Sequence, residues 1–298
     1  MAERAGSAVA RRAGRRRTMK TFLVEGRGIA AAWIRAVQKL DQLPDRRAFH
    51  TVVRIADPLR DDPDTHTGLD WALERLGLQP VETVANTIFP ADLAARSRDH
   101  AHLANRYRAM YDTLRKLSPK NKWGTYFGRL IAYPSPGHEQ GFDQLAAVIS
   151  WLRLESSYKG GKTARYETML AHPLDAVGDG PGPPAAATCS MAVQQPGTDT
   201  GAMATPCLSH LSFQLDRVGA VHALATYRSH YMTERAYGNY LGLGRLLGYV
   251  SAEGGLRPGT LTVVAGYAQI EPGTITQIRP LLTEGVPLFP LSDTSVRK

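Results

Sequence analysis

Two neighbouring segments in the last third of the sequence have the pattern of β-strands. Apolar and polar residues alternate through 210–215 (HLSFQL), and 220–230 (AVHALATYRSH) is a second predicted strand. A period of two places every other side chain on one buried face. Because the two strands follow each other directly, the sheet that contains them is expected to be mixed or mostly antiparallel.

The rest of the chain mixes strand and helix patterns, which indicates an α/β or α+β fold. Strand patterns occur at the start of 21–40 and in 48–59, 123–137, 161–173 and 259–271. Helical patterns occur in the remainder of 21–40 and in 67–78, 91–117, 141–155 and 235–253. The apolar segment 80–90 fits either a strand or a buried helical turn.

The chain of 298 residues is long enough to bury a large core, and we expect a single domain over residues 19–298. Residues 1–18 are expected to form a disordered, Arg-rich tail, because 1–17 contain six arginines and one acidic residue. Such a tail suits weak contact with nucleic acid, or no contact at all. Met19 is an alternative start of translation.

Signals for membranes and export are not found in the sequence. It has no run of about 18 apolar residues, and the N-terminal segment lacks the apolar region of a secretory signal. With only two cysteines, Cys189 and Cys207, a disulfide framework is not expected, and a bridge between them is the less favoured alternative. We therefore expect a cytoplasmic protein without membrane contact.

Cys207 stands between Pro206 and the first of the two late strands. A thiol at the start of a strand is held by a turn and stays accessible, whereas a core thiol more often lies inside the apolar run. Cys207 is therefore a candidate nucleophile. His210, on the polar side of the same strand, is a candidate base or polar pocket residue, or else a solvated surface histidine.

Three further polar residues stand out after the second strand. Arg228 and Ser229 end this strand, and a guanidinium beside a hydroxyl suits a phosphate group. Arg165 is a second candidate of the same kind. Asn239 lies in an otherwise apolar helix, where a buried amide needs partners for its donor and its acceptor. A bound ligand or a hydrogen bond within the core would satisfy it.

Two familiar sites are not expected. The glycines of GNYLGLGRLLG (238–248) do not match the spacing of a dinucleotide-binding loop, and they are better explained by close helix packing. His100 and His102 are two residues apart on a predicted helix and point in different directions, so they do not form a metal site.

Several of these residues occur in an order that resembles the thymidylate synthase superfamily. The motif TPC ends at Cys207, YRS gives Arg228 and Ser229, and Asn239 follows at the family's spacing. YFGRLIAYPSPG and FDQLAAVI upstream, and GLRPGTLTVVAGYA downstream, also resemble family motifs. The resemblance extends over about 126–270, close to half of the chain.

The resemblance implies a thymidylate synthase-like three-layer sandwich whose mixed sheet packs back-to-back in a homodimer. It implies that Cys207 adds to C6 of a pyrimidine nucleotide, with Tyr126 assisting proton removal at C5 and Glu82 as an acid/base residue. A nearby arginine would lower the pKa of the thiol.

The resemblance also implies how the nucleotide is bound. Arg228, Ser229 and Arg165 would hold the phosphate, to which the partner subunit contributes in the family. Asn239 would bind the N3/O4 edge of the base, and Gln214 lies near the family's strand glutamine. The expected substrate-binding residues are Arg228, Ser229, Asn239, Gln214, Arg165 and His210, with no metal.

The sequence departs from the family at several of its binding positions. The implied cofactor is 5,10-methylenetetrahydrofolate, but Tyr231 replaces the family's pterin-binding aspartate, and Gln269 and Glu271 replace the His and Tyr that bind the sugar. Leu208 replaces the histidine after the nucleophile. Two extra residues follow Cys207, which predicts a bulge or a register shift in the strand. Ordinary dTMP synthesis is therefore not expected.

Two functions remain. The first is a one-carbon transferase that methylates or hydroxymethylates C5 of a pyrimidine nucleotide through a covalent adduct with Cys207. The alternative is a catalytically lapsed relative that binds a nucleotide or RNA, with help from the Arg-rich tail. A cysteine-dependent hydrolase would need a histidine and an acidic or amide partner, and His210 alone does not supply that set.

Overall fold

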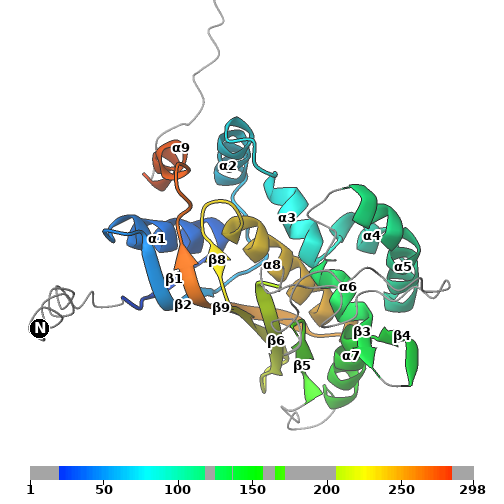
Figure 1. Ribbon diagram of the computed structural model, residues 1–298. Coiled ribbons are helices and arrows are strands. Elements are labelled where there is room, and N and C mark those ends of the chain that lie inside the picture. The colour runs from blue at the N-terminus through cyan, green and yellow to red at the C-terminus, as the bar shows by residue number, and fades with distance from the viewer. Residues whose placement is uncertain (1–19, 118–124, 136, 157–164, 172–205, 284–298) are drawn as a thin grey trace, which may run out of the picture.

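A mixed β-sheet lies at the centre of the molecule (Figure 1). The computed structural model describes residues 20–117, 125–135, 137–156, 165–171 and 206–283. The order of the sheet is β1-β2-β9-β7-β6-β5, with β8 paired to β9 beside this path. Its strands are β1 (Leu23–Gly26), β2 (Arg47–Ile55), β5 (Glu167–Met169), β6 (Leu208–Leu215), β7 (Ala220–Tyr227), β8 (His230–Tyr231) and β9 (Arg257–Gln269). A separate hairpin joins β3 (Tyr133–Ser135) and β4 (His138–Phe142).

The two late strands pair as their order in the sequence predicts. β6 pairs with β7 in antiparallel orientation, whereas β7 and β9 are parallel. A parallel pair needs a crossover connection, which helix α8 (Ala236–Glu253) provides. The expectation of a mixed sheet in an α/β protein is therefore confirmed.

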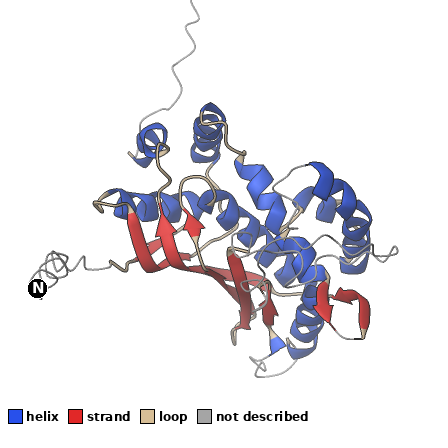
Figure 2. Cartoon of the chain, viewed as in Figure 1, coloured by secondary structure: helices blue, strands red, loops and turns tan. Residues whose placement is uncertain are grey.

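Helices α1 (Ile29–Asp41) and α8 pack against one face of the sheet (Figure 2). The other described helices are α2 (Pro63–Arg75), α3 (Val81–Ile88), α4 (Ala91–Ala95), α5 (His100–Leu117), α6 (Tyr126–Ile131), α7 (Gln144–Glu155), α9 (Ile275–Ile278) and the 3-10 turn η5 (Arg279–Leu282). None of the helices in these residues has the length and apolar character needed to cross a membrane.

The register of the strands gives the two faces of the sheet opposite character. One row of paired residues is buried under the helices and comprises Val24, Val53, Val263, Ala225, Leu211 and Thr168. The two flanking rows point the other way. One row comprises Leu23, Val52, Val264, Thr226, His210 and Met169. The other row comprises Glu25, Arg54, Thr262, Leu224, Ser212 and Glu167. Every side chain in these two rows is at least partly exposed. We call them the outer face.

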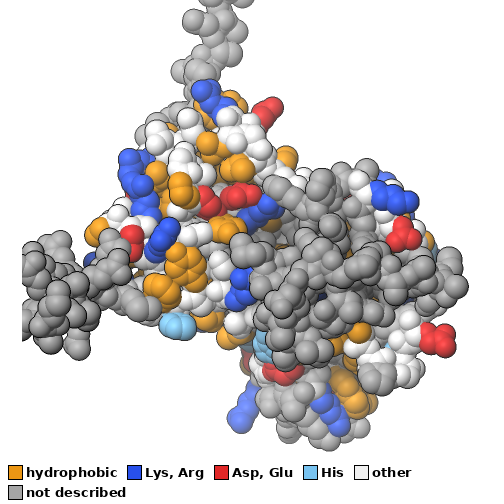
Figure 3. All heavy atoms as spheres, viewed as in Figure 1, with side chains coloured by type: hydrophobic (Ala, Val, Ile, Leu, Met, Phe, Trp, Pro, Cys, Tyr) orange, Lys and Arg blue, Asp and Glu red, His pale blue; other side chains and the backbone are white. Residues whose placement is uncertain are grey.

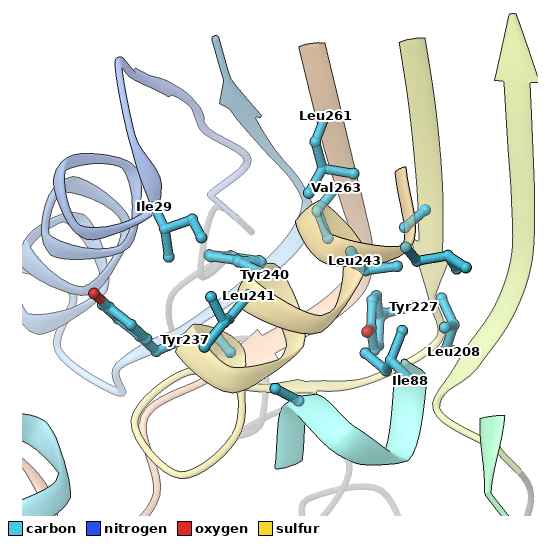
Figure 4. Close-up of a cluster of buried hydrophobic side chains, with 14 of the residues drawn as sticks. Ile29, Ile88, Leu208, Tyr227, Tyr237, Tyr240, Leu241, Leu243, Leu261 and Val263 are labelled. Carbon is cyan, nitrogen blue, oxygen red and sulfur yellow. The ribbon is translucent and has the colours of Figure 1, made fainter. Parts of the chain in front are cut away.

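Glycines allow α8 to pack closely on its neighbours, as the sequence predicts. A Cβ at Gly238 would lie 2.7 Å from Cβ of Val84 on α3, and one at Gly244 would lie 2.0 Å from the carbonyl oxygen of Pro58. Both distances are too short for an alanine without movement of the neighbouring element. The buried surface of α8 is seen in Figure 4, where its tyrosines and leucines point into the core on several sides.

The structure confirms one alternative and corrects two local predictions. The segment 80–90, predicted as either a strand or a buried helical turn, contains helix α3, and its buried side chains face α8. The predicted loop and strand at 123–137 begins instead with helix α6, because the hydroxyl of Thr125 caps the amide of Gly128 and starts a helical turn. The long predicted helix at 91–117 is divided into α4 and α5.

Candidate active site

Cys207 lies where the chain enters β6, at the border between the core and the surface. The residue is partly buried, packs against the hydrophobic core and is a free thiol. The register of β6 against β7 shifts between Leu208 and His210, so the bulge or register shift expected after Cys207 is present. A bulge re-aims the chain at a strand end and separates Cys207 from the regular ladder.

Tyr126 stands beside Cys207, although 81 positions separate them in the sequence. It is the first residue of α6, and its hydroxyl lies against the backbone amides of Cys207 and Leu208. Burial raises the pKa of Tyr126 to about 12, and the nearby thiol adds to the shift. Its hydroxyl is therefore protonated at neutral pH and is available as a donor.

Arg228 interacts with the Cys207 segment through backbone hydrogen bonds and through the charge of its guanidinium. Its amide donates to the carbonyl of Cys207 at 2.8 Å, and its Nε donates to the carbonyl of Pro206 at 3.3 Å. The side chain is exposed, and Ser229 next to it is partly exposed. Arg228 thus lies beside the thiol at the end of β7, and Ser229 follows it in the chain.

A second arginine near the thiol is missed by the sequence reasoning. Arg235 precedes α8, donates to Oε1 of Gln79 at 2.8 Å and forms an ion pair with Glu234. Its charge lowers the pKa of both Cys207 and Tyr126. Arg235 lies between Arg228 and Asn239 in the sequence, but no sequence pattern indicates that its side chain lies near the thiol.

The expected lowering of the thiol pKa is not the net result. Arg228 and Arg235 do lower the pKa of Cys207, but burial raises it by more, so the pKa lies above its usual value. The group is therefore a thiol, not a thiolate, in the resting protein at neutral pH. Desolvation outweighs two cations here because the sulfur packs against the core while Arg228 stays in solvent.

A chain of ring contacts leads from the thiol to Asn239. Tyr227, opposite Leu208 in the ladder, is close enough to Cys207 and Tyr126 for their charges to raise its pKa further after burial has done so. His230 stacks on Tyr227 with ring centroids 4.3 Å apart and an angle of 12°. Nδ2 of Asn239 then lies 3.1 Å from Nε2 of His230. Tyr227 and His230 were also missed, although they flank the Arg-Ser pair in the sequence.

Two buried hydroxyl groups in this region have no hydrogen-bond partner among the described residues. They belong to Tyr227 and Tyr240, which are 1% and 0% exposed. The edge of the His230 ring contacts Tyr240 at 5.6 Å between centroids. Buried polar atoms are normally hydrogen-bonded, so these two hydroxyls can still bind a further polar group. Figure 4 shows Tyr227 between Leu208, Ile88 and Leu243.

The candidate acid/base Glu82 is occupied elsewhere. Its carboxylate forms a two-pronged ion pair with Arg245 of α8, with N–O distances of 2.6 and 2.7 Å. The hydrogen bond with Arg245 lowers the pKa of Glu82. Its other charged neighbours are His66 and Asp61, and the charges that act on Cys207 are those of Arg228 and Arg235.

Arg165 is also held within the chain. Its guanidinium lies 3.6 Å above the ring centre of Trp151 and pairs with the buried carboxylate of Glu155 at 3.2 Å. The same carboxylate accepts a short hydrogen bond from Tyr166. In this chain Arg165 therefore belongs to a cluster beside β5, and the structure does not bring it to Cys207.

His210 and Gln214 lie on the outer side of β6, away from the helices. Nε2 of His210 pairs with Glu167 at 2.7 Å, and Nε2 of Gln214 lies 3.3 Å from the same carboxylate. Gln214 is seven residues beyond Cys207 along a strand, which corresponds to about 20 Å. The structure thus places both residues on the outer face of the sheet rather than beside the thiol.

The positions that depart from the family have well-defined surroundings. Tyr231 is 38% exposed at the short strand β8. Glu271 is part of a local network in which its carboxylate accepts from the hydroxyl and amide of Thr233 and from the amide of Glu234. Burial raises the pKa of Glu271. Gln269 ends β9, and its carbonyl accepts from Met232.

The remaining sequence predictions concern the tail and the histidines. The Arg-rich residues 1–17 and Cys189 lie outside the described residues. His100 contacts Asp143 and Tyr249, whereas Nδ1 of His102 accepts from the amide of Arg98. Within the described residues, no group of three or more potential ligands is arranged to hold a metal ion. In the view of Figure 3, the described Lys and Arg side chains are scattered among hydrophobic and acidic ones.

Comparison with known proteins gives no assignment. No protein-family model matches the sequence, and no curated protein matches it significantly.

Proposed function

We propose that this protein is a thymidylate synthase-like one-carbon transferase that acts at C5 of a pyrimidine nucleotide through a covalent adduct with Cys207. The observation that carries the proposal is the grouping of Cys207, Tyr126, Arg228 and, through Tyr227 and His230, Asn239. These residues come from distant parts of the sequence. A free thiol can attack the base, an exposed cation can bind the phosphate, and a buried amide can recognise the edge of the base.

The covalent step uses the sulfur of Cys207 as the nucleophile. The thiol loses its proton, the sulfur bonds to C6, and the electrons of the C5–C6 double bond move onto C5 and the O4 carbonyl. C5 then takes up an electrophilic one-carbon group and loses its proton. Expulsion of the thiolate restores the double bond. Arg228 and Arg235 stabilise the negative charge on sulfur when it forms, and Tyr126 donates a hydrogen bond beside it.

The implied folate does not fit the described residues in the manner of the family. Tyr231 offers one phenolic hydroxyl where a pterin ring needs a carboxylate that accepts two hydrogen bonds. The phenol is also exposed rather than held in a polar pocket. We therefore derive no step through folate, and the methyl or hydroxymethyl outcome depends on the donor.

The outer face supports a back-to-back homodimer. Its central positions include Val52, Val264 and Leu224, and charged residues lie near its edges. Accessible apolar side chains at the middle of a sheet face are suited to contact with a second copy, because the same patch can serve both subunits. Sedimentation of the wild-type chain is expected to show a dimer, and Leu224→Glu is expected to shift it to a monomer.

A catalytically lapsed nucleotide- or RNA-binding protein is the second candidate. It is favoured by the raised pKa of Cys207, which keeps the thiol protonated, and by the pairing of Glu82 with Arg245, which occupies the carboxylate that the resemblance implies as acid/base. This candidate predicts nucleotide or RNA binding without exchange at C5.

Release of tritium from C5 distinguishes the two candidates. We expect the full chain to release tritium from at least one of UMP, dUMP, CMP and dCMP labelled at C5. Reversible addition of sulfur to C6 makes the C5 hydrogen exchangeable. Cys207→Ser should abolish release, because an alcohol is a much weaker nucleophile and leaving group.

The matched control is Cys189→Ser, since Cys189 is the other cysteine of the sequence. It should release tritium at the wild-type rate. Nucleotide binding without release from any of the four substrates would reject the transferase and favour the lapsed protein.

A further inference from the structure

We propose that His230 is a positioning residue that fixes the orientation of the Asn239 amide, so that the site accepts one order of donor and acceptor on a pyrimidine base. The inference rests on the proposed function for its ligand. It assigns a role to a histidine that neither touches the thiol nor belongs to the phosphate site.

The contacts leave His230 little freedom. It is 2% exposed, its ring is stacked on Tyr227 and its edge meets Tyr240. Tyr227 is itself fixed by its place in the ladder opposite Leu208. The imidazole is therefore clamped by two aromatic rings, and its Nε2 points at Nδ2 of Asn239.

The protonation state of the ring decides the direction of the hydrogen bond. Burial lowers the pKa of His230 to about 3, and no other cause contributes. The ring is therefore neutral at physiological pH. An amide nitrogen can only donate, so Nε2 of His230 must accept and the ring proton must sit on Nδ1.

With the ring proton on Nδ1, this bond opposes a flip of the Asn239 amide, because the flipped amide would set Oδ1 against the lone pair of Nε2. An amide is almost symmetric in shape, and a flip exchanges its donor and its acceptor. With Nδ2 committed to His230, Oδ1 has a fixed position and accepts no hydrogen bond from the described residues. Asn239 retains 5% exposure, so the group is close to the accessible surface without being solvated.

A fixed amide distinguishes the two common pyrimidines. Uracil presents a donor at N3 and an acceptor at O4, whereas cytosine presents an acceptor at N3 and a donor at N4. The orientation that matches one base opposes a donor to a donor on the other. In the proposed function Asn239 binds the N3/O4 edge, so we expect uracil nucleotides to be preferred.

Binding of uracil and cytosine nucleotides tests the selectivity. We expect the wild-type chain to bind UMP or dUMP at least tenfold more tightly than its cytosine counterpart. His230→Leu removes the acceptor and should reduce the preference to threefold or less. His230→Gln has a carbonyl that can accept from Asn239 and should restore it. His222→Leu, at a histidine that bonds Thr260 and Asp216 on β7, is the matched control and should keep the wild-type ratio.

Nitrogen-15 spectra of labelled histidine test the positioning without any nucleotide. One histidine should stay neutral with its proton on Nδ1 from pH 5 to pH 8, and its signals should be missing in His230→Gln. This measurement still decides the matter if His230→Leu does not fold. A charged ring, or a proton on Nε2, would overturn the positioning role even if the nucleotides bind.

The outcomes separate the inference from the proposed function. Equal affinity for the two bases in the wild type, or a preference unchanged in folded His230→Leu, rejects the inference while tritium release still supports the transferase. Lack of binding to any nucleotide rejects both, whatever the state of the ring.

Discussion

Two polar regions contain residues of α8, and they differ in how their polar side chains are hydrogen-bonded. The first, which we call the thiol region, comprises Cys207, Tyr126, Tyr227, His230 and Asn239. The second, the ion-paired region, comprises Asp61, His66, Tyr237, Glu82 and Arg245. Figure 4 shows Tyr227 and Tyr237 on either side of the helix.

The ion-paired region is complete in itself. Asp61 accepts from Tyr237 at 2.5 Å and contacts His66 at 2.7 Å, and Glu82 and Arg245 form a two-pronged pair. The thiol region instead contains the buried hydroxyl of Tyr227, which has no hydrogen-bond partner among the described residues, and the same holds for Tyr240, whose ring contacts His230. Polar groups that are hydrogen-bonded to one another stabilise the fold. Buried polar groups without a hydrogen-bond partner, near a free thiol, are typical of a binding site.

The buried His230 of the thiol region makes the stability of the protein depend on pH. The pKa of His230 is lowered to about 3, so below pH 6.5 the unfolded chain binds a proton that the folded one excludes. The free energy of unfolding should therefore fall on acidification by about 1 kcal/mol per pH unit more in the wild type than in His230→Gln. Chemical denaturation at several values between pH 6.5 and pH 4 measures this difference. Equal slopes would mean that the ring is accessible to protons in the folded protein.

The reactivity of Cys207 gives the next largest effect. Its pKa is raised, so its alkylation by iodoacetamide should accelerate about tenfold per pH unit between pH 7 and pH 9, as the thiolate forms. Arg235→Ala removes a cation that lowers this pKa and should slow the reaction a few-fold at a fixed pH. Rates are measured in a Cys189→Ser background. A rate that is already maximal at pH 7 would contradict the dominance of burial over the two arginines.

Local patterns were sufficient for the elements that form the centre of the fold. The alternation in 210–215 predicts a strand with one buried face, and the apolar run in 235–253 predicts a buried helix; the structure has β6 and α8 there. By contrast, α6 was predicted as loop and strand, because its aromatic and apolar residues carry no helical period over so short a length. Its start depends on one cap, Thr125.

The candidate site was predictable only in its individual residues. Cys207, Arg228 and Asn239 stood out because a thiol, a cation and an amide in those places require an explanation. The net pKa of the thiol depends on burial against residues far away in the sequence, so the sequence suggested the opposite direction. The partner of Asn239 was expected to be a ligand or a core bond, and the ring of His230 could not be identified without the stacking on Tyr227.

His66 should respond to pH in the opposite sense to His230. Its hydrogen bond with Asp61, followed by the charges of Asp61 and Asp70, raises its pKa despite partial burial. The resulting stabilisation is present below about pH 6.5 and is lost as the pH rises through the higher folded value. Relative to His66→Gln, the wild type should lose about 1 kcal/mol or less between pH 6 and pH 9, since the carboxylates are partly exposed. A loss on acidification instead would remove the contrast between the two regions.

Substitution of Glu82 tests whether this residue belongs to the ion-paired region or to the thiol region. The resemblance implies a role for it as an acid/base residue, but its ion pair with Arg245 places it in the ion-paired region. The pair is substantially exposed, so Glu82→Gln should change the free energy of unfolding by less than about 1 kcal/mol. It should also leave tritium release within about threefold of the wild type, because an amide can still accept from Arg245. Arg245→Met is the matched variant for the other partner. A loss of release by two orders of magnitude in a folded Glu82→Gln protein would move Glu82 into the thiol region, since a carboxylate would then have to reach the nucleotide when it binds.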